Sequence, residues 1–123
     1  RAALEAIAFQ VADVYSAMEA DMGSPLGELR ADGGASRNAT VMQFQSDILG
    51  RPVAAAAAPE VSALGAAALA FSSIGISMPG VPAAVHFAPQ MDAETQHNHR
   101  QRWQSALTQT LATQNQKNTG GTP

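Results

Sequence analysis

One stretch of sequence decides the fold: Leu29-Arg30-Ala31-Asp32-Gly33-Gly34-Ala35-Ser36-Arg37-Asn38. Its first residues alternate apolar and polar side chains, which predicts a short β-strand. The two glycines that follow allow the backbone to turn sharply and to approach a ligand closely. A helical pattern begins after the glycines and runs to about Leu49. A strand, a glycine turn and a helix in this order predict an α/β fold.

The glycine pair is also the part of the chain most typical of a ligand site. Free N–H groups at the start of the following helix favour an anion such as a phosphate group. Asn38 lies one turn further on, where its amide can both donate to and accept from the same ligand. The alternative is an ordinary glycine turn in which Ser36 caps the helix. The residues alone leave both alternatives open.

The flanking segments extend the α/β pattern. Apolar residues recur at steps of three and four over residues 1–22, which predicts a helix with one buried face. Gly23 and Gly50 stand where left-handed caps end helices. A second strand is expected within residues 52–58, which contain five consecutive alanines. The helix between the two strands forms a crossover, so the strands are predicted to be parallel.

The second half of the chain predicts two more helices. The first covers residues 61–74 and contains Gly65 among small side chains, which indicates close approach of a neighbouring backbone or ligand. The glycines and prolines of residues 75–91 predict a loop. Asp92 is a good N-cap for the last helix, in which Trp103 is followed by leucines at steps of four.

Two features favour a piece of a longer chain. Arg1 opens directly into a helix without a capping residue before it. Two strands also do not make a stable sheet without further strands or a partner surface. We therefore expect residues 1–112 to be part of a larger domain, followed by a disordered polar tail over residues 113–123.

Composition excludes several classes of protein. The 123 residues contain no cysteine, which excludes disulfides, thiolate zinc sites and a cysteine nucleophile, and suits a reducing cytoplasmic compartment. The formal net charge of −3 argues against a nucleic-acid partner. No apolar run approaches the ~20 residues that span a bilayer, so no membrane partner is expected.

The three histidines do not suggest a metal site. His97 and His99 are two residues apart, so they point to different faces of a helix, and no carboxylate partner is evident for His86, His97 or His99. We expect all three to be solvated surface residues.

Ordered blocks of this sequence resemble the FGGY family of carbohydrate kinases. The block 42–50, Met-Gln-Phe-Gln-Ser-Asp-Ile-Leu-Gly, is similar to the corresponding segment of the family's glycerol kinases. The other blocks occur in the family's order and are residues 1–14, residues 29–35 with Asn38, the Glu-Val-Ser-Ala-Leu-Gly-Ala-Ala run at 60–67, and a tail segment containing Phe87, Pro89, Met91, Asp92 and Trp103.

The resemblance implies a fragment of an actin-like ATPase (ribonuclease-H-like) domain, with short parallel strands and crossover helices. It implies that the chain is the C-terminal part of the ATP-side domain. The glycines matching Gly33 and Gly34 then lie against the adenosine and α-phosphate of ATP, with Ala35 beside them, and Asn38 contacts the nucleotide. The helix around Gly65 packs beneath this loop.

The implied reaction is transfer of the γ-phosphoryl group of ATP, with Mg²⁺, to a hydroxyl of a sugar or polyol. The catalytic base and the acceptor pocket belong to the family's N-terminal domain, so no catalytic residue is expected in this fragment, and Asp32 is not the base. Departures from the glycerol kinase pattern at residues 54–58 and 75–77 leave the acceptor open, with glycerol one candidate. The alternative is a non-catalytic nucleotide-binding or assembly module of the same fold, and a homo-oligomer stays open.

Overall fold

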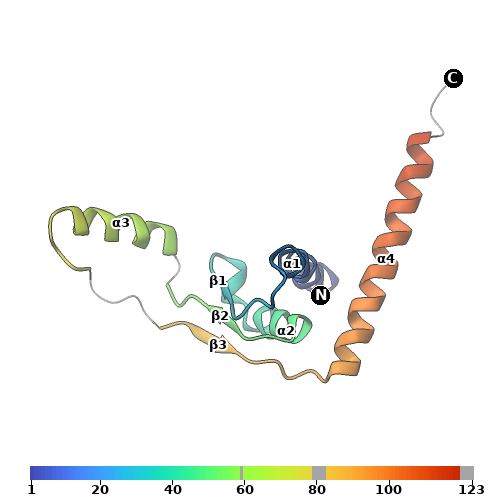
Figure 1. The fold of residues 1–123 in the computed structure, drawn as a ribbon, viewed down its shortest axis with the longest axis horizontal. Coiled ribbons are helices and arrows are strands. Elements are labelled where there is room, and N and C mark those ends of the chain that lie inside the picture. The colour runs from blue at the N-terminus through green and yellow to red at the C-terminus, as the bar shows by residue number, and fades with distance from the viewer. Residues whose placement is uncertain (59, 79–82, 120–123) are drawn as a thin grey trace. The chain divides into compact units, whose positions relative to one another are not determined.

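The computed structural model describes residues 1–58, 60–78 and 83–119, with side chains as far as residue 113 (Figure 1). The chain divides into two compact units, Arg1–Gln90 and Met91–Pro123, which are described separately below. The assignment of residues 1–112 to one domain and of residues 113–123 to a polar tail stays a prediction.

The first unit begins with helix α1 (Ala2–Met22), as its apolar periodicity predicts. Its buried face consists of Ala8, Phe9, Ala12 and Tyr15. The prediction that the large apolar residues of the repeat form this face was wrong for those that are exposed, which are Leu4, Ile7, Val14, Met18 and Met22. The backbone N–H of Gly23 donates to the Glu19 carbonyl at 3.0 Å, and Gly23 has a φ of 65°. The predicted left-handed cap is therefore confirmed.

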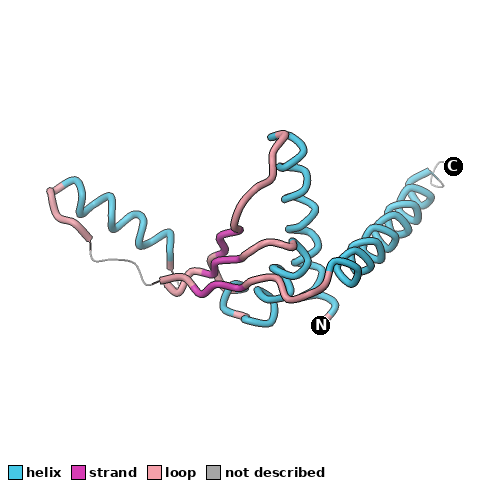
Figure 2. Tube along the Cα trace, turned by 60° about the horizontal axis from the view of Figure 1, so that its bottom comes forward, coloured by secondary structure: helices cyan, strands magenta, loops and turns pink. Residues whose placement is uncertain are grey.

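Three short strands lie side by side in one sheet of order β1-β2-β3 (Figure 2). β1 (Leu29–Ala31) and β2 (Val53–Ala55) are parallel, as predicted from the crossover helix between them. β3 (Val85–Phe87) is antiparallel to β2, so the sheet is mixed. The prediction of a loop throughout residues 75–91 was therefore wrong.

Polar side chains of residues 39–49, which form a helix, hold β3 and the residues after it, and this is why the sequence did not predict the strand. Ser46 Oγ donates to the carbonyl of Phe87 at 3.1 Å, and Gln43 Nε2 donates to the carbonyl of Ala88 at 2.9 Å. The backbone N–H of Gln90 donates to Asp47 Oδ1 at 2.7 Å. These partners are more than 40 residues away in sequence, so a local pattern of three residues flanked by prolines gives no sign of them.

Helix α2 (Ala39–Leu49) carries these polar side chains and also the buried apolar residues Val41, Met42, Ile48 and Leu49. It packs against α1, β2 and β3. The rings of Phe9 and Phe44 meet edge to face with centroids 5.7 Å apart. The fully buried Gln45 amide donates to the Ala8 carbonyl at 3.2 Å, so α1 and α2 are joined by a buried polar contact as well as apolar packing.

A polar corner fixes the start of β1. Glu19 Oε1 accepts from the backbone N–H of Leu26 and from Arg51 Nη2, both at 2.8 Å. The Tyr15 hydroxyl donates to the carbonyl of Gly27. Burial raises the pKa of Tyr15, and the neighbouring Arg51 opposes part of that rise. The end of α1, the entry to β1 and the turn before β2 are thereby held together.

Helix α3 (Val61–Ser73) has no buried residue. A Cβ added at Gly65 would meet no atom of the described residues within 4 Å. The expectation that this helix packs beneath the glycine loop is thus not met in this structure.

The second unit contains helix α4 (Ala93–Thr119). Asp92 caps it as predicted, because Asp92 Oδ1 accepts from the backbone N–H of Thr95 at 2.8 Å and Oδ2 from the Thr95 hydroxyl at 2.7 Å. The backbone and side-chain hydrogen bonds from Thr95 lower the pKa of Asp92. The tail predicted to be disordered from residue 113 continues as helix to Thr119, and its last four residues lie outside the described residues.

Candidate functional site

The glycine loop follows β1 at the edge where the two parallel strands end. β1 and β2 pair in register, Ala31 with Ala55, so their carboxyl ends lie together. In open α/β sheets this edge is where ligands bind. Residues 32–38 are exposed apart from Ser36. The loop therefore presents its backbone to solvent at the expected end of the sheet.

Gly33 and Gly34 differ in their backbone conformation, and therefore in whether the fold requires a glycine at each position. Gly33 has a φ of +85°, a left-handed conformation that L side chains rarely adopt. Gly34 has a φ of −61° and a ψ of −42°, an ordinary right-handed helical conformation open to any residue. A Cβ added at Gly34 would meet no atom of the described part of the chain within 4 Å. The fold therefore requires a glycine at position 33 but not at position 34.

Ser36 holds the loop from inside. It belongs to a 3-10 turn, η1 (Ala35–Arg37), and is the buried residue of that turn. Its Oγ donates to the carbonyl of Gly33 at 2.8 Å, and the backbone N–H of Asn38 donates to the carbonyl of Ala35 at 3.1 Å. The proposed capping of α2 by Ser36 is wrong, because the η1 turn places Ser36 too early to cap α2. Ala35 is exposed beside the glycines.

Asn38 is the N-cap of α2. Its Oδ1 accepts from the backbone N–H groups of Thr40 at 3.1 Å and Val41 at 3.2 Å. The amide expected to both donate and accept toward a ligand therefore has its oxygen committed to the helix. The Nδ2 group is the part of Asn38 that is left to act on a ligand, and it can only donate.

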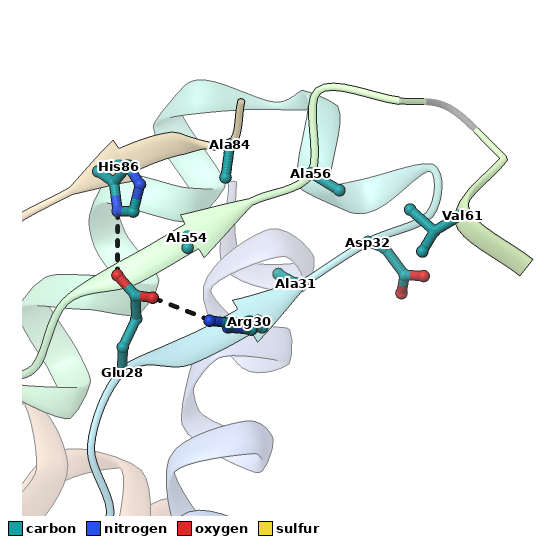
Figure 3. Close-up of a pocket in the computed structure, with 9 residues that line it drawn as sticks. All are labelled: Glu28, Arg30, Ala31, Asp32, Ala54, Ala56, Val61, Ala84 and His86. Atoms are coloured by element: carbon teal, nitrogen blue, oxygen red, sulfur yellow. Dashed lines mark hydrogen bonds and ion pairs between the residues drawn. The ribbon is translucent and has the colours of Figure 1, made fainter. Parts of the chain in front are cut away.

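A hollow of about 520 Å³ lies on the sheet (Figure 3). Arg30, Ala54 and His86 occupy one row across the three strands. Glu28 bridges this row above Ala54, with Oε1 3.0 Å from His86 Nδ1 and Oε2 4.0 Å from Arg30 Nε (Figure 3). His86 is exposed, as predicted, but the sequence did not show its carboxylate partner, because Glu28 and His86 meet only through the pairing of β1 with β2 and of β2 with β3. No ligand is assigned to this hollow.

The described residues, 1–58, 60–78 and 83–119, contain no group of three His, Asp or Glu side chains that could hold a metal ion. Asp32 is the carboxylate of the loop, and it is exposed. The donor set of the described residues therefore does not fit a metal site by itself. Over the same residues, no helix combines the length and apolar character that crossing a bilayer requires.

A family model for the C-terminal domain of the FGGY family of carbohydrate kinases matches residues 1–74. The match covers more than half of the chain and includes the glycine loop and the N-cap of α2. The chain therefore belongs to the FGGY family of carbohydrate kinases.

Individual relatives place the chain within that family. It is 48% identical over 113 residues to a glycerol kinase of Koribacter versatilis, covering 87% of this chain and 23% of the relative. A glycerol kinase of Dechloromonas aromatica is 61% identical over 75 residues, which is 61% of this chain and 15% of the relative. The chain thus spans less than a quarter of the length of these two relatives.

Solved structures agree on the fold. The Plasmodium falciparum glycerol kinase with ADP superposes with a TM-score of 0.74 at 32% identity, covering 88% of this chain and 23% of that one. The xylulose kinase of Rhodospirillum rubrum gives a TM-score of 0.64 at 29% identity, covering 91% and 24% of the two chains. The fold of this chain is therefore similar to part of each of these two kinases.

Proposed function

We propose that this chain is part of an ATP-dependent sugar or polyol kinase and supplies one side of its adenine-nucleotide site. Gly33, Gly34, Ala35 and Asn38 are the proposed nucleotide-binding residues. The surrounding fold is proposed to be that of an actin-like ATPase, and the compartment the cytoplasm.

The observation that carries the proposal is the conformation of Gly34. Its backbone is helical, and a Cβ there would meet no described atom within 4 Å, so neither dihedral strain nor packing calls for a glycine. Close approach of a ligand to the backbone is one physical reason for omitting a side chain at an exposed loop position, and it is the reason that this proposal adopts. The structurally similar glycerol kinase of Plasmodium falciparum was solved with ADP, which supports a nucleotide as that ligand.

The residues of this chain would bind and orient the nucleotide. Gly33 sets the turn, Gly34 exposes its backbone to the α-phosphate side, and Asn38 directs an amide N–H₂ group to an acceptor on the nucleotide. Fixed donors of this kind lower the barrier because they are already in place when the reaction occurs.

In the proposed reaction, the bond between the γ-phosphorus and its bridging oxygen breaks, and a new bond forms to an acceptor hydroxyl oxygen. The hydroxyl proton passes to a base outside this chain. Mg²⁺ would neutralise charge on the phosphate groups when bound.

The test uses the full-length protein that contains this chain. We expect it to bind ATP and to form ADP when given an acceptor from a panel of glycerol, erythritol and ketopentoses. Glycerol is the first acceptor to assay because curated glycerol kinases match the chain. Binding of ATP without phosphoryl transfer to any acceptor would favour a non-catalytic nucleotide-binding module, and absence of ATP binding would contradict both functions.

A further inference from the structure

The cations of the first unit are almost all neutralised by neighbouring carboxylates. Residues 1–90 contain four arginines and no lysine, against eight aspartates and glutamates, a formal charge of −4. Three of the arginines form ion pairs, which are Arg1–Glu5 at 2.7 Å, Arg30–Glu28 at 4.0 Å and Arg51–Glu19 at 2.8 Å. The fourth is Arg37, and within the described part of the chain no carboxylate pairs with it.

Arg37 also has a distinctive position. It lies between Gly34 and Asn38, at the end of the η1 turn. Its backbone N–H donates to the carbonyl of Gly34 at 3.4 Å, and its neighbour Ser36 is buried and bonded to Gly33. The backbone is thus held on both sides while the Arg37 side chain is exposed. The unpaired cation of this unit therefore extends from the segment proposed to bind the nucleotide.

We propose that Arg37 is a further nucleotide-binding residue, whose guanidinium group donates hydrogen bonds to phosphate oxygens of ATP. This inference rests on the proposed nucleotide site. Guanidinium suits phosphate because its planar set of N–H donors can make two parallel hydrogen bonds to one group. Among the described residues, no ion pair of Arg37 has to be broken first.

Charge strengthens the argument. The unit as a whole is negative, so it repels a polyanion, and an unpaired cation beside the loop gives the phosphate groups a local attraction. Arg30 provides the contrast. It is also exposed, but it pairs with Glu28 and lies in a row across the sheet rather than on the loop. Both arginines carry the same charge, so position distinguishes their expected effects.

The experiment measures dissociation constants of the full-length protein for ATP, ADP and adenosine. Arg37→Ala is expected to weaken ATP and ADP about tenfold, the effect of losing a hydrogen bond to a charged group, and to leave adenosine binding unchanged. Arg37→Lys is expected to restore part of the affinity, because it keeps the charge but not the planar donor set. The matched control, Arg30→Ala, removes the same charge and is expected to bind all three ligands like the wild type. The loss in Arg37→Ala should shrink in 1 M NaCl, where screening is strong.

Several results would overturn the inference. Wild-type affinity for ATP in Arg37→Ala would do so, and so would an equal loss of adenosine affinity, which would place Arg37 on the nucleoside. An equal loss of ATP affinity in Arg30→Ala would show that the effect comes from the overall charge and not from the position of Arg37. A wild-type protein that binds neither ATP nor ADP would refute the proposed function itself. Because Arg37 is exposed and unpaired, the unfolding midpoint of its variants should stay unchanged, so the variants remain folded for the test.

Discussion

The two glycines of the loop can be separated by mutation, because one is required by the fold and the other by the proposed ligand. Gly33 has a φ of +85°, so Gly33→Ala forces an L residue into a left-handed conformation at a cost of about 1 to 2 kcal/mol of stability. Gly34 is helical, and a Cβ there has open space among the described residues. Gly34→Ala should therefore stabilise the protein by about 0.4 to 1 kcal/mol, because it restricts the unfolded chain.

Ligand binding should show the opposite pattern. In Gly34→Val the branched side chain blocks the approach of the nucleotide to the loop backbone. Losing one hydrogen bond to a charged phosphate costs about 1.5 to 3 kcal/mol, or roughly a tenfold to hundredfold higher KM for ATP. The KM for the acceptor should stay near its wild-type value. Gly34→Ala should raise the KM for ATP by a smaller factor, since its side chain is smaller.

The assay combines urea unfolding with steady-state kinetics on the full-length protein and its three variants. Two outcomes would refute the reasoning. The first is a Gly34→Val variant with an unchanged KM for ATP, which would mean that no ligand approaches Gly34. The second is a Gly34→Ala variant that loses as much stability as Gly33→Ala, which would mean that the fold itself requires glycine at position 34.

Three further predictions follow from single contacts. Asn38→Ala should lower the free energy of unfolding by about 1 kcal/mol through loss of the N-cap, whereas Asn38→Asp should keep the cap and still weaken ATP binding. Urea unfolding measures the stability and calorimetry the ATP binding, and equal stability of both variants would contradict the cap. The pKa of Asp92 is lowered by Thr95, so this carboxylate stabilises the start of α4 above its ordinary pKa of 3.8 and the effect is lost as pH falls through the folded value. Hydrogen exchange of the first turn of α4, corrected for intrinsic rates, should accelerate over that acid range in the wild type but not in Asp92→Asn, and the same acceleration in both would exclude Asp92 as the cause. Ile48→Ala should lower the free energy of unfolding by about 2 to 5 kcal/mol because Ile48 is fully buried, whereas Ile74→Ala should lower it by about 0.5 kcal/mol or less because Ile74 is exposed. Equal urea midpoints of the two variants would contradict this.

Sequence reasoning reached the helices most reliably, because their end signals are local. Gly23 and Gly50 both adopt the left-handed conformation that ends α1 and α2, and Asp92 accepts the capping hydrogen bond of α4. Each of these signals involves residues within one turn of the helix end, which is also the range over which sequence patterns carry information.

The sequence did not predict β3 or the cap of α2, because both depend on more than the residues within one helical turn. β3 has no strong strand pattern of its own, and it is held by Ser46, Gln43 and Asp47 from a helix about 40 residues earlier. Ser36 and Asn38 are both good capping residues on chemical grounds. The choice between them depended on where the η1 turn ends and α2 begins, which backbone dihedrals decide.

The order of strand, glycine loop and helix, the glycine ends of α1 and α2 and the Asp92 cap of α4 follow from the sequence alone, since each depends on residues that are neighbours along the chain. The family follows from the order of several such blocks along the sequence. The tertiary structure decided the antiparallel partner of β2, the commitment of the Asn38 oxygen to α2, the different demands on Gly33 and Gly34, and the isolation of Arg37 from every described carboxylate. These depend on dihedral angles and on contacts between residues far apart in sequence. They are therefore defined only once the chain is folded.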